Sequence, residues 1–196
     1  MNDHKGFFAM MARMKYIERW ALMRNSVSEN ICEHSLEVAM LAHGLGIIGR
    51  KRFGKDLSPE RLAMLGMYHD CTEIITGDMP TPVKYANDEL KEAYKAIEDS
   101  AAHRLLEMLP EDLRAEYESY FLPEQITPEE YRYVKAADKL SALIKCIEEE
   151  KTGNQEFRSA KQATYESLQQ MNMPEVTVFC EAFLPEYYKT LDELEH

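Results

Sequence analysis

The feature that most restricts the fold is the stretch at residues 68–73, which reads YHDCTE and stands near the end of an apolar helical segment. His69 and Asp70 are costly to bury in the mostly apolar interior of a helix bundle unless partners or a metal ion offset their desolvation. Glu73 follows His69 by one helical turn and is therefore expected on the same face. The fold must bring other polar groups, or a metal ion, to this cluster.

The pattern along the whole chain predicts an all-α fold. Apolar side chains recur at helical spacing, and no segment shows strand-like alternation. Caps at Asn30, Ser58 and Thr127 mark helix starts. We expect one domain, residues 1–196, formed by a helical bundle of about seven to nine helices. The expected helices cover residues 6–24, 30–49, 58–76, 86–109, 110–121, 127–150, 154–171 and 174–192.

The segment after the YHDCTE stretch is expected to be a loop. The helix must end near Gly77, and prolines at 80 and 82 favour an extended backbone over residues 78–82. Because this loop leaves the His-Asp-Glu cluster directly, we expect it to line a pocket. The alternative is an ordinary proline-rich connector.

A second histidine is predicted on a buried face. In the helix over 30–49, Val38, Leu41, Leu45 and Ile48 follow His34 at helical intervals, so His34 belongs to the apolar side. A single buried histidine is most often a satisfied core residue, but two such histidines favour a ligand site. Gly66 removes a side chain beside His69, which a neighbouring helix can exploit for a close approach.

Asp138 is the fourth candidate. It lies off the main apolar arc of its helix, on a side with the small residues Ser141 and Ala142, and periodicity does not decide between a solvated acid and a ligand. With His34, His69 and Asp70 it would supply two imidazoles and two carboxylates. That set suits Mn²⁺, Co²⁺, Fe²⁺ or Zn²⁺ and leaves positions open for water and substrate, as in metal-assisted hydrolysis.

Composition narrows the class of partner. A net charge of −12 argues against binding to a nucleic acid polymer, whose phosphates require a basic face. No apolar run is expected to span a membrane and no signal peptide is evident, so we expect a cytoplasmic protein. The four scattered cysteines, without a C-x-x-C pair, are expected to be reduced core residues.

These residues resemble a known family. The order His34, His69-Asp70 and Asp138 is similar to the H…HD…D signature of HD-domain phosphohydrolases. Arg19-Trp20, which by themselves predict only a core tryptophan beside a solvated arginine, add to the similarity, as do EHS at 33–35, the YHDxxE pattern and TGDMPTPVK at 76–84. Over nearly its whole length the chain resembles the bacterial 5′-deoxynucleotidase family.

The resemblance implies an all-helical HD-domain fold and a homodimer. It also implies removal of the 5′-phosphate from deoxyribonucleoside 5′-monophosphates by water that one divalent ion, such as Co²⁺ or Mn²⁺, activates. The implied metal ligands are His34, His69, Asp70 and Asp138. The implied catalytic residues are Glu73, as the catalytic carboxylate, and Arg19, which orients the phosphate. The implied substrate-binding residues are Arg19, Trp20 (against the sugar), Asp70, Asp138, Asp78, Met79, Pro80 and Thr81.

Two other classes remain as alternatives. The first is another HD phosphohydrolase, acting on nucleoside triphosphates, cyclic nucleotides or guanosine tetraphosphate. It is disfavoured because the site offers few basic residues and because helical phase directs His43 and His103 away from it. The second is a non-catalytic helical module that binds nucleotides as a sensor, which is disfavoured because the four ligands and Glu73 are all present.

Overall fold

The computed structural model describes residues 5–84 and 86–195. Within them it contains α-helices and short 3₁₀ helices, and its only β-type pairing is the isolated bridge between Glu18 and Asn30. Seven α-helices have nine or more residues, in agreement with the expected number. The elements are α1 Phe7–Met11, η1 Ala12–Tyr16, α2 Ile31–Phe53, α3 Pro59–Tyr68, α4 Glu73–Thr76, α5 Thr81–Lys84, α6 Asp88–Leu106, α7 Glu111–Phe121, η2 Pro123–Gln125, α8 Pro128–Lys151, α9 Arg158–Gln170, α10 Pro174–Ala182, η3 Leu184–Tyr188 and α11 Leu191–Leu194.

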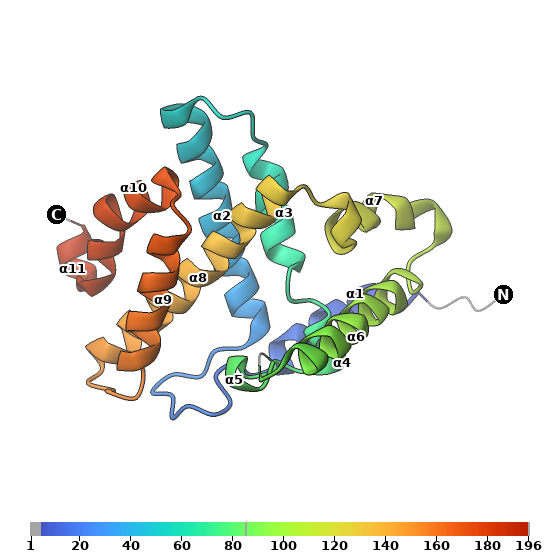
Figure 1. Cartoon of the computed structure of the whole chain (residues 1–196), viewed down its shortest axis with the longest axis horizontal. Helices are drawn as coiled ribbons and strands as arrows, with labels where there is room; N and C mark the ends of the chain where they lie inside the picture. Colours follow the sequence, from blue (N-terminus) through green and yellow to red (C-terminus); the bar gives the residue numbers. More distant parts are fainter. Residues whose placement is uncertain (1–4, 85, 196) are drawn as a thin grey trace.

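The two longest helices, α2 and α8, cross at the centre of the molecule (Figure 1). On one side α9, α10 and α11 pack near α8, and on the other α1, α6 and α7 form a second group. Each side has its own apolar cluster. One contains buried residues of α2, α3, α8, α9 and α10, and the other contains residues of α1, η1, α6 and α7.

The helices α2 and α3 approach each other closely, as the glycine in α3 led us to expect. A Cβ at Gly66 would lie 3.0 Å from the Cα of Ala39 and 3.1 Å from its N. Such a separation is shorter than normal contacts, so only glycine allows the two backbones to pack at this distance. This contact brings the end of α3, with His69, toward the start of α2, with His34.

The prediction of a helix over residues 6–24 is wrong beyond Tyr16. After α1 and η1 the chain becomes extended, and the backbone N–H of Arg19 donates to Glu29 O at 2.8 Å while Ile31 N–H donates to Ile17 O at 2.9 Å. These bonds to a distant segment replace the local helical ones. Trp20 then takes a positive φ of 59°, which is uncommon for a residue with a side chain.

The helix expected over 58–76 is also interrupted. His69 Nδ1 lies 2.7 Å from Gly66 O, so the side chain occupies the carbonyl that a continuing helix would use, and residues 69–72 form tight turns before α4. Glu73 is therefore the first residue of a new short helix rather than the next turn of the same one. The loop expected over 78–82 is shorter than predicted, because α5 already begins at Thr81.

Other boundaries differ less. The helix from Asn30 continues to Phe53 and ends at Gly54 in the left-handed conformation. The helix expected over 174–192 is interrupted at Phe183, after which η3 contains Pro185. The caps at Asn30, Ser58 and Thr127 are confirmed, the first and last as complete capping boxes.

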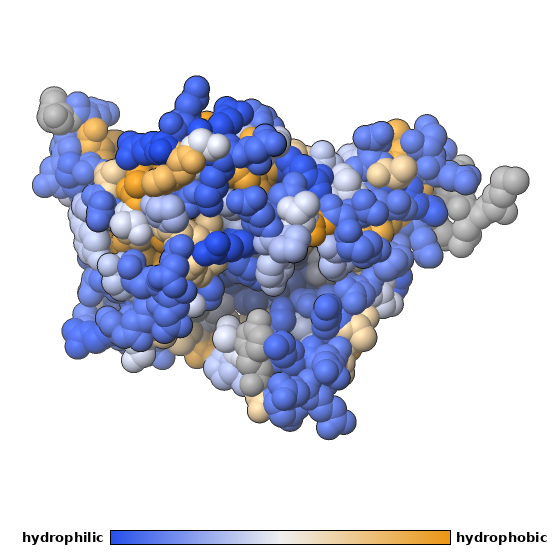
Figure 2. Space-filling view, turned by 45° about the horizontal axis from the view of Figure 1, so that its top comes forward, coloured by the Kyte–Doolittle hydropathy of each residue, from blue (hydrophilic) through white to orange (hydrophobic). Residues whose placement is uncertain are grey.

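The surface of the protein is mainly hydrophilic. Hydrophilic residues cover most of the face in Figure 2, as the net charge of −12 suggests. By length and composition α2 passes as a possible membrane span, contrary to expectation, but 56% of its apolar window is buried inside the protein.

Cys71 and Cys146 are buried as expected, whereas Cys32 is exposed and Cys180 half-buried, and all four are free.

Candidate active site

His34 is fully buried and held by a hydrogen-bond chain from α8. Its Nδ1 lies 2.9 Å from Ser141 Oγ, and the Ser141 hydroxyl donates to Glu37 Oε2 at 2.6 Å. Because the serine proton goes to Glu37, we assign the ring proton of His34 to Nδ1. Nε2 therefore carries a lone pair.

His69 is oriented in the same way by its own helix. Its Nδ1 lies 2.7 Å from the carbonyl oxygen of Gly66, which can only accept a hydrogen bond. The proton is thus on Nδ1, and Nε2 again carries a lone pair. A ring nitrogen fixed by a backbone carbonyl is the usual support of a histidine that binds a metal through its other nitrogen.

These two nitrogens face carboxylate oxygens. His34 Nε2 lies 3.4 Å from Asp70 Oδ2 and 3.4 Å from Asp138 Oδ1, and His69 Nε2 lies 3.1 Å from Asp70 Oδ2 and 4.0 Å from Asp138 Oδ1. Both Nε2 atoms are buried without a hydrogen-bond partner. Electron-rich atoms arranged around one point repel each other unless a cation lies among them. The donor set fits a divalent ion.

The structure therefore brings the four predicted ligands together. The ligand atoms of His34, His69 and Asp70 all lie within 4.8 Å of one another, and Asp138 approaches both imidazoles from α8. Asp138 is also paired with Lys135 Nζ at 3.2 Å. His103, which helical phase excluded, is exposed on α6. The assignment of individual ligands stays a prediction.

The two aspartates are ionised at neutral pH. Burial alone would raise their pKa values, but without a bound metal ion the protonated rings of His69 and His34 hold the pKa of Asp70 well below its usual range, and a divalent ion would act in the same direction. For Asp138, Lys135 and His34 oppose burial in the same way and lower its pKa. The cluster therefore presents two negative charges to a cation.

The pKa of Glu73 is shifted in the opposite direction from those of Asp70 and Asp138. It is 6% exposed, and its Oε2 is buried without a hydrogen-bond partner. Burial, together with the nearby charges of Asp70 and Asp78, raises the pKa of Glu73 to about 10. A neutral carboxyl group beside two ionised aspartates is the pattern of a general acid.

Arg19 and Trp20 share one partner, Glu29. The Arg19 guanidinium donates to Glu29 Oε2 at 2.6 Å, and the Trp20 indole N–H donates to the same oxygen at 2.8 Å. Burial would lower the pKa of Arg19, but Glu29, Asp70 and Asp138 raise it, so the guanidinium stays charged. The expectation of a core tryptophan beside a solvated arginine is wrong, because both side chains are only partly exposed and both face the same cavity.

That cavity has a volume of about 790 Å³, in the range of small-molecule sites. Arg19, Trp20 and Asp138 line it together with Asp78, Met79 and Pro80 of the loop and Thr81 at the start of α5. Burial raises the pKa of Asp78, while Arg19 opposes this effect. Asp138 belongs to both the imidazole cluster and the cavity wall, so the two features form one site.

One wall of the cavity was not predicted. Helix α9 contributes small side chains, and its neighbour Phe157 packs edge-on against Trp20 with ring centroids 5.2 Å apart. The signal in the sequence was a run of small residues at helical spacing on α9. These residues are Ser159, Ala160, Ala163, Thr164 and Ser167. Glu29, Glu37 and Ser141 were also missed as partners of the site, because each acts across a long separation in the sequence.

The fold is that of the HD-domain phosphohydrolases, and the imidazole-carboxylate cluster fits a metal site within it. A solved HD-domain phosphohydrolase from Listeria innocua superposes with a TM-score of 0.80, covering 96% of this chain and 91% of the other at 22% identity. The cyanophage S-2L HD phosphohydrolase DatZ, bound to dA and one catalytic Zn²⁺ ion, superposes with a TM-score of 0.64 at 23% identity, covering 93% and 96% of the two chains.

The sequence comparison is more specific. The family model described as 5′-deoxynucleotidase YfbR-like matches residues 6–187, and the chain belongs to this family. A 5′-deoxynucleotidase of Vibrio cholerae is 48% identical over 188 residues, which is 96% of this chain and 97% of the relative. The 5′-deoxynucleotidase YfbR of Shigella boydii is 45% identical over 188 residues, covering 96% and 94%. The protein is thus a 5′-deoxynucleotidase, and the sensor alternative falls away.

Proposed function

We propose that the enzyme hydrolyses deoxyribonucleoside 5′-monophosphates to deoxyribonucleosides and phosphate, with one divalent metal ion held by His34, His69, Asp70 and Asp138. The observation that carries this proposal is the pair of buried Nε2 atoms that lack a hydrogen-bond partner and face two carboxylates at the edge of a nucleotide-sized cavity. A divalent ion bound there lowers the pKa of water and supplies a nucleophile at neutral pH.

The donor set narrows the choice of metal ion. Two imidazoles and two carboxylates suit Co²⁺, Mn²⁺ and Fe²⁺, and also Zn²⁺, the ion bound to the cyanophage HD phosphohydrolase. A purely carboxylate site would instead favour Mg²⁺ or Ca²⁺. We propose Co²⁺ or Mn²⁺ as the ion that supports the highest rate.

Arg19 is proposed to bind the 5′-phosphate. Its planar guanidinium presents paired donors that match phosphate oxygens, and one nitrogen is already fixed by Glu29 at 2.6 Å. The guanidinium lines the same cavity as Asp138. This position lets Arg19 orient the phosphate toward the imidazole-carboxylate cluster and offset its charge.

Glu73 is proposed to protonate the leaving 5′ oxygen. Its raised pKa keeps the carboxyl group protonated at neutral pH. The alkoxide that leaves is a poor leaving group without a proton, so a neutral acid beside the cluster lowers the barrier. After the reaction the carboxylate regains its proton from water.

Sugar selectivity is proposed to depend on Trp20 and Asp78. The indole is fixed on both edges, by Glu29 through its N–H and by Phe157 through its ring, so it does not move to admit an additional 2′-hydroxyl. Asp78 lines the same cavity and can accept a hydrogen bond from the 3′-hydroxyl. Met79, Pro80 and Thr81 complete the wall along the nucleoside.

The first experiment is phosphate release from deoxyadenosine and adenosine 5′-monophosphates after metal removal and re-addition of Co²⁺, Mn²⁺, Zn²⁺ or Mg²⁺. We expect release from the deoxy substrate only, and only with a transition metal. Equal release from both substrates would contradict the sugar argument, and full activity in the stripped enzyme would contradict the metal proposal.

Three broader properties also belong to this proposal: a single domain over residues 1–196, a cytoplasmic location, and a homodimer. The dimer is supported by exposed apolar side chains along one side of α2, namely Leu36, Met40 and Ile47, which are 54%, 61% and 36% exposed. The stripe at 176–184 instead contributes mainly to the core through Val176 and Phe179. Light scattering should show a dimer that Met40→Glu converts to a monomer.

A further inference from the structure

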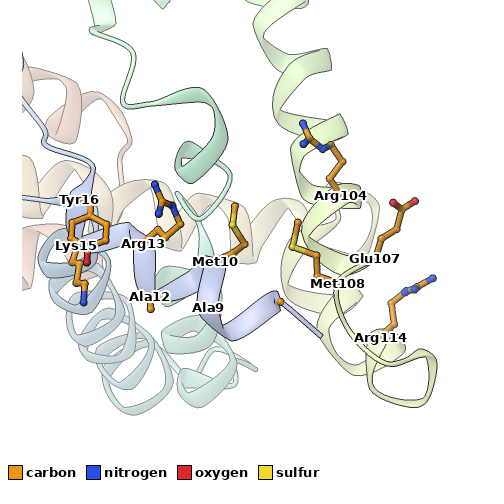
Figure 3. A pocket seen from close by; sticks show the side chains of 11 residues that line it. Ala9, Met10, Ala12, Arg13, Lys15, Tyr16, Arg104, Glu107, Met108 and Arg114 are labelled. Carbon is orange, nitrogen blue, oxygen red and sulfur yellow. The ribbon is translucent and has the colours of Figure 1, made fainter. Parts of the chain in front are cut away.

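A second cavity, of about 920 Å³, lies between the N-terminal helices and the end of α6 (Figure 3). Its walls are α1 and η1 on one side and residues of α6, α7 and the turn between them on the other. It shares no lining residue with the active-site cavity. The family's activity leaves it without a role.

The rim of this second cavity is cationic. Arg13 and Lys15 come from η1, Arg104 from α6 and Arg114 from α7, against a single lining carboxylate, Glu107. In the part of the chain that the structure describes, none of the four cations forms an ion pair with a carboxylate. Arg13 and Lys15 instead lie over the ring of Tyr16, at 5.7 and 5.1 Å from its centroid. Four such cations on a chain of net charge −12 make a local site for an anion.

One of the four cations is already oriented. The Nε of Arg114 donates to the carbonyl oxygen of Leu106 at 3.2 Å, near the end of α6. This bond holds the guanidinium in place and leaves its other N–H groups for a ligand. A guanidinium binds phosphate through paired donors. Because the bond to Leu106 already restricts this side chain, Arg114 loses little conformational entropy on binding a phosphate.

The floor of the cavity is apolar. Met10 and Met108 project from the two opposite walls, and Tyr16 lies at the η1 end (Figure 3). At the start of α1, a Cβ added at Gly6 would lie in ordinary contact with Met108 Sδ, at 3.8 Å. Thioether and aromatic surfaces adapt to flat ring systems. The cavity therefore combines an apolar floor with charged groups at its edge.

We propose that this cavity binds a nucleoside triphosphate. Arg13 of η1 and Arg104 of α6 come from opposite walls of the cavity, and either guanidinium can bind the phosphates of such a ligand. Met10 and Met108 match the base. Glu107 offers an acceptor to a base amino group or a sugar hydroxyl, whereas a polyphosphate without a nucleoside would only be repelled by it. The cavity volume lies within the range that ligands of this size occupy.

The test is calorimetric titration of the metal-loaded full-length enzyme with adenosine 5′-(β,γ-imido)triphosphate, with Mg²⁺ in excess so that the probe does not remove the enzyme's metal. We expect one site outside the active site, so that binding persists in Arg19→Ala. The variant R13A/R104A should weaken it at least tenfold. R50A/R52A, which removes two exposed arginines from α2, is the matched control and should bind normally.

Inorganic tripolyphosphate is the second probe and should bind at least tenfold more weakly than the nucleotide. Binding that disappears in Arg19→Ala would assign the nucleotide to the active site and overturn the proposal, as would equal losses in R13A/R104A and R50A/R52A. Tripolyphosphate that binds as tightly as the nucleotide would overturn the assignment to a nucleoside. Phosphate release from deoxyadenosine monophosphate by R13A/R104A should stay normal, which separates this site from the catalytic one.

Discussion

At the scale of single residues, the site is defined by which groups are charged. Asp70 and Asp138 are ionised because imidazoles and Lys135 surround them, whereas Glu73 is neutral because burial and the charges of Asp70 and Asp78 outweigh the opposing charges of Lys84 and Arg19. Three carboxyl groups that are close in space thus have different protonation states. This difference supports the proposed division between metal binding by the two aspartates and acid catalysis by Glu73.

We predict that Glu73→Gln lowers kcat by about 10² to 10⁴, the usual contribution of a general acid. Glutamine keeps the shape of the protonated acid but has no proton to transfer to the leaving oxygen. Steady-state kinetics and metal analysis check this together. Undiminished phosphate release at full metal content would show that another group protonates the product.

The same substitution should not destabilise the metal-stripped protein. The pKa of Glu73 in the folded state, about 10, lies above its ordinary value of 4.5, so the folded chain binds more protons than the unfolded chain between these pH values. The free energy of unfolding therefore falls as the pH rises through this window. Glu73→Gln should remove part of this fall, which urea titrations at pH 6 and pH 9 would measure.

Trp20→Ala is predicted to raise the activity on ribonucleotides relative to deoxyribonucleotides by about tenfold to a hundredfold, because an apolar wall alone discriminates against an added hydroxyl to about that extent. The ratio of kcat/KM for the two substrates is the measurement. Phe157→Leu, which removes the ring that packs against the indole, should change the ratio in the same direction but less. A constant ratio in Trp20→Ala would exclude this residue from sugar selection.

At the scale of elements, the contact of α2 with α3 determines the distance between the two histidines. His34 lies on α2 and His69 follows α3, and the separation of the helices depends on the missing side chain at Gly66. We predict that Gly66→Ala destabilises the fold by about 1–3 kcal/mol, the usual cost of overpacking, and weakens Mn²⁺ binding.

Gly44→Ala is the matched control, since a Cβ at this position of α2 meets nothing within 4 Å. It should stabilise the protein by up to about 1 kcal/mol through helix propensity and leave Mn²⁺ affinity unchanged. Urea unfolding and metal titration of both variants provide the comparison. If Gly66→Ala behaved like Gly44→Ala, the close approach would not control the site.

At the scale of the whole molecule, metal binding is predicted to stabilise the fold, because the proposed ligands come from α2, α8 and the turn after α3. Saturation with Mn²⁺ at about a hundred times its Kd should add about 2.7 kcal/mol to the free energy of unfolding. Calorimetric unfolding with and without metal measures this increase, and Asp138→Ala should abolish most of it. Two separate transitions, one for each apolar cluster, would contradict the single-domain proposal.

Local signals in the sequence were sufficient for much of the fold. The caps at Asn30, Ser58 and Thr127, and the buried phase of His34, depend on interactions within about one or two helical turns, so residue types and spacing predict them. The resemblance of the motifs to 5′-deoxynucleotidases also identified the activity. The break after Tyr68 escaped prediction because the bond from a histidine side chain to Gly66 O outcompetes the helical one.

What only the tertiary structure decided involves residues that are distant along the chain. The sequence predicted that His34 and His69 are buried, but packing of α2 against α3 and α8 determined that both Nε2 atoms face Asp70 and Asp138. Pairing with Glu29 turned Arg19 and Trp20 out of the expected helix and toward the cavity. The physical reason is that helical periodicity specifies the side of a helix a residue occupies, whereas the partner it meets there depends on how separate helices pack.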